Sequence, residues 1–113
     1  MPANLGQGNC QYTVISGTGT TVLNTGQLGP VASHPGVFYG AQLIALGTSP
    51  VFTALDIITS GTTTTTNTLM SGTGTAAGQR FVAGLEGVGV RYRGELAVIT
   101  TATAAGTWNA LWD

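Results

Sequence analysis

The sequence predicts an all-β fold: an antiparallel β-sandwich of about seven to nine strands with almost no helix. Two observations lead to this prediction. Glycine or proline interrupts the chain every few residues, with 18 glycines and four prolines among 113 residues. Between these breaks lie short segments rich in β-branched and aromatic residues, and none keeps the apolar i, i+3, i+4, i+7 spacing of a helix for long. Such a pattern is typical of a sandwich or a small barrel.

The first predicted strands lie within residues 10–24. In the segment CQYTVIS, Cys10, Tyr12 and Val14 share one face, and the turn SGTG leads from it into the short segment TTVLN. Two β-prone segments joined by a short glycine-containing turn are typical of a β-hairpin. We therefore predict a hairpin here.

Two long apolar segments follow the link GQLGPVASHPG. They are VFYGAQLIAL and VFTALDIIT, joined by GTSP. Strands that are apolar along most of their length are covered on at least one face, so both are predicted to be central strands. Phe52, at the start of the second segment, is assigned to the core.

Five consecutive threonines, Thr62 to Thr66, follow these segments. Threonine is β-branched and favours extended backbone, while its hydroxyl remains well solvated. The run therefore predicts an edge strand that is soluble without charge. A disordered linker or an O-glycosylated stalk are the alternatives, but the run is short, has no proline nearby and lies between apolar segments.

The clearest period of two runs from Val88 to Thr100, which predicts a single strand with a bend or bulge at Gly94. Its apolar face carries Val88, Val90, Tyr92, Leu96 and Val98, and its polar face carries Arg91, Arg93 and Glu95. Of the apolar residues, Tyr92, Leu96 and Val98 are assigned to the core.

The last segment, TWNALWD, is also predicted to be a strand. Trp108, Ala110 and Trp112 share one of its faces. Burial of large aromatic side chains is a major source of stability, so a terminal strand this aromatic is expected to be docked into the sheet.

Charge is scarce in this chain. Three basic and four acidic residues give a net charge of −1, and all three basic residues are arginines. There is no basic field to hold a phosphate backbone, so nucleic acid is not an expected partner. Near-zero net charge also removes the repulsion that keeps copies apart, and a homo-oligomer is therefore expected.

Length, cysteine content and the N-terminal segment add further expectations. The length suits one domain, predicted to span 10–113 after a flexible arm, 1–9, whose one strong hydrophobe is Leu5. Cys10 is the only cysteine, which excludes an intrachain disulfide and fits a reducing cytosol. No apolar run approaches the ~20 residues of a membrane span, and neither secretion nor membrane insertion is expected.

No cofactor or nucleotide site is predicted. The segment GTGTAA places Gly72, Gly74 and Ala77 at the spacing of a dinucleotide fingerprint, but no helical pattern follows it. His34 lies beside Ser33, and Asp56 could complete a hydrolase triad. Nothing in VASHPG supplies a nucleophile elbow or oxyanion donors, so a loop histidine is the preferred interpretation.

No metal or catalytic site is predicted either. Cys10 has no second cysteine and no nearby histidine, and it is interpreted as a small buried apolar residue. The four acids could include a glycosidase pair: Asp56, Glu86, Glu95 and Asp113. A sugar site also needs exposed aromatic rings, and most of the eight aromatic residues should be needed for the core. We therefore predict that the protein is not an enzyme.

From His34 onward the chain resembles small β-sandwich proteins of tailed-phage virions, the head decoration or cement proteins. An ordered series of segments carries the resemblance: PGVFYGAQLIALGTSP, FTALDIITSG, LMSGTGTAAGQRFVAG and GVGVRYRGELAVITTATAAGTWNALWD. It implies a jelly-roll-like fold, synthesis in the host cytoplasm, a place on the capsid surface, and the major capsid protein as partner. Local threefold positions of a capsid lattice further suggest a trimer.

Similar β modules also occur in tail and head-fibre proteins. The alternative function is therefore a fibre- or tail-associated module that binds host-surface carbohydrate. Exposed positions for Tyr39, Trp108 and Trp112 would favour this alternative.

The charged face at residues 91–95 is a candidate interface. Arg91 and Arg93 could meet carboxylates on a capsid or on an adjacent copy, because the arginine fork pairs with a carboxylate through two hydrogen bonds. The alternative is a solvated sheet face in which Glu95 partly neutralises its neighbours, worth under ~1 kcal/mol. Leu5 joins this candidate interface if the N-terminal arm orders against a neighbour.

Overall fold

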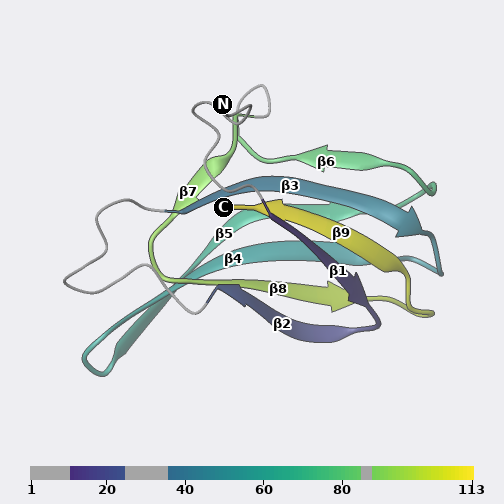
Figure 1. Ribbon diagram of the computed structural model, residues 1–113. Coiled ribbons are helices and arrows are strands. Elements are labelled where there is room, and N and C mark those ends of the chain that lie inside the picture. Colours follow the sequence, from purple (N-terminus) through teal and green to yellow (C-terminus); the bar gives the residue numbers. More distant parts are fainter. Residues whose placement is uncertain (1–10, 25–35, 85–87) are drawn as a thin grey trace.

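The computed structural model describes residues 11–24, 36–84 and 88–113, and in this part of the chain all regular structure is β-strand (Figure 1). The strands are β1 (Gln11–Ser16), β2 (Gly19–Asn24), β3 (Gly36–Ala45), β4 (Val51–Ser60), β5 (Thr63–Thr73), β6 (Arg80–Val82), β7 (Val90–Tyr92), β8 (Glu95–Thr101) and β9 (Thr107–Trp112). Sheet A has the order β1-β9-β3-β6, with β7 also pairing with β3, and sheet B has the order β2-β8-β4-β5. The predicted all-β antiparallel sandwich is confirmed.

The strands pair in a nested order. β1 pairs with β9, β2 with β8, β3 with both β6 and β7, and β4 with β5, always antiparallel. The described strands thus follow one long antiparallel ribbon, folded back at the β4–β5 hairpin, whose successive pairs lie alternately in sheet A and sheet B. This wrapping is the jelly-roll arrangement.

The hairpin predicted within residues 10–24 is wrong. β1 belongs to sheet A and β2 to sheet B, so the turn between them joins the two sheets rather than two paired strands. Gly17 and Gly19 both have positive φ, which lets the chain turn there. A two-stranded hairpin is marginal by itself, whereas pairing with β9 and β8 places each strand in a larger sheet over the core.

The prediction of one strand from Val88 to Thr100 is also wrong, because the structure has two strands there. The segment forms β7 and β8, which lie in different sheets, and the chain passes between the sheets at Arg93 and Gly94. A Cβ on Gly94 would run into the backbone oxygen of Ile57, so this close crossing requires glycine. Val88 lies before β7 and is 71% exposed instead of contributing to the apolar face.

The core lies between the two sheets. Phe52, Tyr92, Leu96 and Val98 are fully buried, as predicted. The ring of Phe52 lies 5.1 Å from that of Trp108, between centroids, in a tilted contact that joins sheet B to sheet A. Fully burying one large apolar side chain contributes about 1.5–3 kcal/mol, so this aromatic cluster is a main source of stability.

The remaining strand predictions are confirmed. Trp108, Ala110 and Trp112 are buried, and β9 lies between β1 and β3. The two long apolar segments form the central strands β3 and β4, while the threonine run forms part of β5, at the edge of sheet B. Residues 1–9 and Cys10 lie outside the described residues. No helix in the described part of the chain is long and apolar enough to cross a membrane.

Candidate functional site

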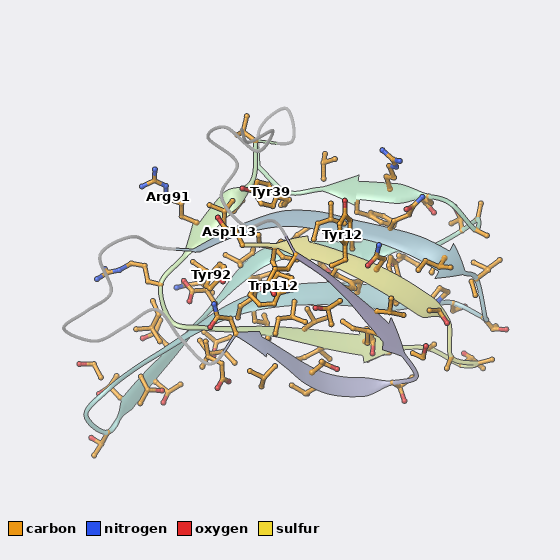
Figure 2. The ribbon with its side chains drawn as sticks, viewed as in Figure 1. Tyr12, Tyr39, Arg91, Tyr92, Trp112 and Asp113 are labelled. Atoms are coloured by element: carbon orange, nitrogen blue, oxygen red, sulfur yellow. The ribbon has the colours of Figure 1, made fainter. Side chains whose placement is uncertain are left out.

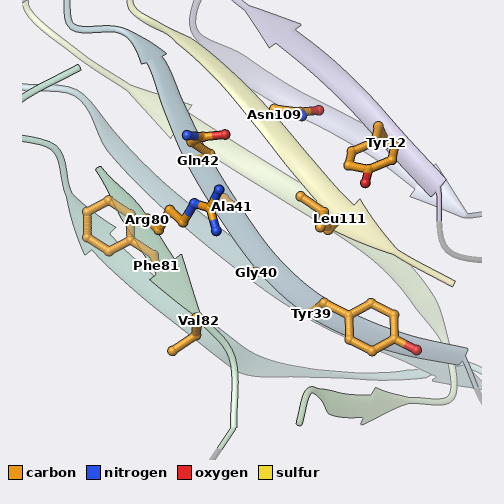
Figure 3. Close-up of a pocket in the computed structure, with 10 residues that line it drawn as sticks. All are labelled: Tyr12, Tyr39, Gly40, Ala41, Gln42, Arg80, Phe81, Val82, Asn109 and Leu111. Atoms are coloured by element: carbon orange, nitrogen blue, oxygen red, sulfur yellow. The ribbon is translucent and has the colours of Figure 1, made fainter. Parts of the chain in front are cut away.

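A groove of about 440 Å³ lies on the outer face of sheet A, within the roughly 300–1,000 Å³ range of small-molecule sites (Figure 3). Strands β1, β9, β3 and β6 contribute to it. The lining residues are Tyr12, Tyr39, Gly40, Ala41, Gln42, Arg80, Phe81, Val82, Asn109 and Leu111. Because successive residues of a strand point to opposite faces, most of these side chains alternate with the buried core residues of the same strands.

A row of polar side chains crosses this face. The register places Asn109 of β9 opposite Gln42 of β3, and Gln42 opposite Arg80 of β6. The Gln42 amide Nε2 donates to the backbone oxygen of Gly78 at 3.4 Å. The Asn109 Oδ1 is buried and has no hydrogen-bond partner among the described residues. The row therefore combines two amides, one with an unused acceptor, and a guanidinium.

An apolar row runs beside the polar one. Tyr12 lies opposite Leu111, Leu111 opposite Gly40, and Gly40 opposite Val82. Gly40 has a φ of 145° at a register shift in β3, and a Cβ there would run into the backbone oxygen of Phe81. The row consequently lacks a side chain at its centre, which leaves room for the groove.

Two tyrosines lie at one end of the groove. Figure 3 shows Tyr12 from β1 and Tyr39 from β3 with Leu111 between them. Tyr12 is 68% exposed and Tyr39 is half-buried. An aromatic ring with an apolar face and a polar hydroxyl suits a ligand that has both apolar and hydroxyl groups. Tyrosine rings, amides and one guanidinium together favour binding a hydroxyl-rich small molecule.

The groove does not have the residues of an acid–base catalyst. Among the described residues that line it, Arg80 is the only charged one and none is a carboxylate. A glycosidase needs two carboxyl groups flanking the scissile bond, so the groove does not supply that machinery. Among the described residues, no group of three His, Cys, Asp or Glu side chains lies together as metal ligands would.

The predicted interface residues lie on different elements of the fold. Arg91 is on β7 in sheet A, Glu95 begins β8 in sheet B, and Arg93 lies in the crossing between them. The predicted shared polar face therefore does not form one sheet surface. Both arginines are exposed, Glu95 is half-buried, and no ion pair within the described residues involves any of the three. Leu5 lies outside the described residues.

The structure describes two of the remaining sequence candidates, the GTGTAA segment and Asp56. GTGTAA forms the end of β5 and the turn after it, and the next described element is the strand β6. The Asp56 carboxylate is buried and accepts the backbone N–H groups of Arg93 and Gly94. Ser33, His34 and Glu86 lie outside the described residues.

This groove was not predicted from the sequence. Tyr12, Tyr39, Arg80 and Asn109 come from four strands that are distant in sequence, so only the topology brings them together. The period of two in β1 places Tyr12 and Val14 on one face and Ile15 on the other. The sequence did not show which face is buried, and the structure buries Ile15.

Comparisons with protein-family models, with curated proteins and with solved structures find no match for this chain. The residues and the geometry described above are therefore the basis for proposing a function.

Proposed function

We propose that this chain is a non-enzymatic structural protein of a tailed-phage virion, a decoration or cement protein on the capsid surface. The resemblance of the segments after His34 supports this proposal. The fold is compatible with it, since jelly rolls are common among viral capsid domains, although they are also common among lectins. Fold alone does not decide function, whereas the surface of a protein determines what it can bind.

The observation that carries the proposal is the outer face of sheet B. Hydroxyl side chains cover much of it: Thr20, Thr53, Thr66, Thr68, Ser71 and Thr101. Glu95 is the only charged residue on the outward positions of its four strands. Covering hydroxyl groups costs much less solvation free energy than covering charges, provided that the hydroxyls find hydrogen-bond partners in the interface. Many copies on a lattice can then stabilise a shell even when each contact is weak.

The proposed partners are the major capsid protein and other copies of this chain. Near-zero net charge favours a homo-oligomer, and threefold positions of a lattice would accommodate a trimer. Arg91 and Arg93 are proposed to meet carboxylates of the capsid or of an adjacent copy, with Leu5 of the arm adding an apolar contact. Nucleic acid, membranes and cofactors have no part in this proposal.

Localisation on the particle tests the proposal. Electron cryomicroscopy of virions carrying this protein should place it at icosahedrally repeated positions on the outer shell. Purified protein added to mature heads that lack it should restore this density and raise the temperature at which the heads break. Removing residues 1–9 should lower the occupancy. Density only at the tail, or no change in head stability, would contradict the capsid assignment.

The groove on the outer face of sheet A favours a second function, a tail- or fibre-associated module that binds host carbohydrate. Trp108 and Trp112 are buried, and the Trp112 indole N–H already donates to Thr13 Oγ1 at 2.9 Å, so neither tryptophan can serve as a sugar platform. The groove beside Tyr12 and Tyr39 provides aromatic rings elsewhere. Its test is titration of the purified protein with neutral oligosaccharides, followed by NMR shifts of groove residues.

A further inference from the structure

Strand β5 is a long edge strand of sheet B. It pairs with β4 on one side, and no strand among the described residues pairs with its other side. Alternate residues of an edge strand direct their backbone N–H and C=O groups away from the sheet. Residues 63–68 are all exposed, so these groups are available along the first half of β5.

This edge has few of the usual protective features. Natural sheets protect edges with charged side chains, proline, short strands or bulges. β5 is eleven residues long and has neither a charged residue nor proline. One bulge, at Leu69, interrupts its pairing with β4, but Thr63 to Thr68 pair without a register shift. Six consecutive residues therefore form a regular, uncharged edge.

The tip of the β4–β5 hairpin has even less support. β8 pairs with β4 only as far as Ile57, while β5 continues to pair with β4 through Ser60. Residues 58–65 thus form a two-stranded ribbon that extends past the rest of sheet B (Figure 1). Two-stranded ribbons are marginally stable in water, and an additional strand would stabilise this one.

We propose that this edge pairs with the same edge of a second copy of the chain, residues 63–68 lying antiparallel to their counterparts across a twofold axis. Because the strand is uncharged, two copies meet without repulsion. Hydroxyl pairs of the required kind already form between β4 and β5, where Thr59 Oγ1 lies 3.2 Å from Thr64 Oγ1 and Thr53 Oγ1 lies 3.1 Å from Ser71 Oγ. The two sheets B then become one continuous sheet. This inference concerns the free protein and does not depend on the virion proposal.

The symmetry predicts a distinctive pairing. A twofold axis perpendicular to the sheet leaves each side chain on the same face of the continuous sheet. Facing residues of the two copies are therefore either both odd-numbered or both even-numbered. At the axis, one residue lies opposite the same residue of the other copy. Facing residues in antiparallel strands have Cα atoms about 4.5–5.5 Å apart. That separation falls in the roughly 4.4–6.8 Å range that a disulfide spans.

Cysteine crosslinking tests the inference in the full-length protein. In a Cys10→Ser background, single variants Thr64→Cys, Thr65→Cys, Thr66→Cys and Asn67→Cys are oxidised mildly and the rates of dimer formation are compared. Thr101→Cys, an exposed threonine on β8 of the same sheet, is the matched control. One β5 variant should crosslink fastest, with slower rates on either side of it. Rates equal to that of the control would overturn the inference.

A second measurement uses charge without oxidation. Sedimentation velocity up to millimolar concentration should show reversible dimers of the parent protein, and the double variant Thr64→Lys/Thr66→Lys should shift to monomer. Thr20→Lys/Thr101→Lys, with both changes at exposed positions of sheet B, should retain the dimer. A parent that stays monomeric throughout would contradict the proposed pairing. A trimer unaffected by the lysines would also contradict it, while leaving the proposed capsid trimer intact.

Discussion

The carboxylate of Asp56, on β4, accepts a hydrogen bond of 2.8 Å from the backbone N–H of Gly94, where the chain passes from sheet A to sheet B. Its second oxygen accepts the N–H of Arg93 at 3.1 Å. One buried side chain thus accepts hydrogen bonds from two consecutive backbone N–H groups at the point where the chain passes between the sheets. Asp56 therefore fixes the position at which β7 ends and β8 begins.

Replacing Asp56 with asparagine should destabilise the fold. An amide of the same shape has only one acceptor oxygen, so its NH₂ group would face one of the two N–H donors. The expected loss is about 1–3 kcal/mol in the free energy of unfolding, measured by urea denaturation. Glu95→Gln is the matched control because that half-buried carboxylate has no hydrogen bond to another described residue, and the change should affect stability little. Equal losses in both variants would contradict a special role for Asp56.

The hydroxyl of Tyr92 joins the end of β2 to the C-terminal residue. It donates to the backbone oxygen of Asp113 at 2.7 Å and accepts from Asn24 Nδ2 at 2.9 Å (Figure 2). Tyr92→Phe should lower the free energy of unfolding by about 1–3 kcal/mol, because it removes two hydrogen bonds that contribute about 0.5–1.5 kcal/mol each. The backbone oxygen of Asp113 keeps its hydrogen bond from the backbone N–H of Val37. Tyr12→Phe removes a hydroxyl from an exposed ring, 68% accessible, and should have little effect. Thermal melts of the two variants that coincide would argue against this role.

Local pattern was sufficient to predict the sandwich class, and the reason is visible in β9. Trp108, Ala110 and Trp112 alternate with outward residues, and a period of two survives whichever strands become neighbours. The same holds for Phe52, Leu96 and Val98. Periodicity identifies the buried face of a strand because it depends only on pleating.

Pairing partners could not be predicted in the same way. The segment before Gly17 and the segment after it have the local pattern of a hairpin, yet their partners lie at the other end of the chain in β9 and β8. The sequence of residues 10–24 does not indicate which strands these segments pair with. The break between β7 and β8 similarly depends on Asp56, more than thirty residues earlier in the chain. The groove could not be predicted for the same reason, because its lining residues come from four separate strands.

Variants of the groove should separate ligand binding from stability. If the groove binds a neutral saccharide, Tyr12→Ala should weaken binding by about 1–2 kcal/mol, because removing an exposed ring eliminates its stacking contact. Val14→Ala is the control: Val14 is 62% exposed on the same face of β1 but does not line the groove. Calorimetric titration with the same oligosaccharide measures both variants. Binding that is equally strong in parent and Tyr12→Ala would place the sugar elsewhere.

The last prediction concerns the two exposed arginines near the crossing between the sheets. Figure 2 shows Arg91 pointing away from both sheets, and Arg93 is exposed in the crossing itself. Exposed side chains of this kind contribute little to folding, so Arg91→Glu/Arg93→Glu should leave the melting temperature almost unchanged. If these guanidiniums pair with carboxylates of a shell or a neighbouring copy, the same variant should bind heads far more weakly, because attraction becomes repulsion.

Two comparisons decide between this interface and a solvated surface. Arg80→Glu carries the same type of charge change on the outer face of sheet A, away from the crossing, and should keep its occupancy on purified heads. Added salt should weaken the binding of the parent protein, because exposed charge pairs are screened over about 10 Å at 0.1 M ionic strength. Equal occupancy of heads by the parent and the double variant would show that Arg91 and Arg93 belong to a solvated surface and not to an interface. Loss of binding in the double variant alone would identify the end of the sandwich at Arg91 and Arg93 as the docking surface.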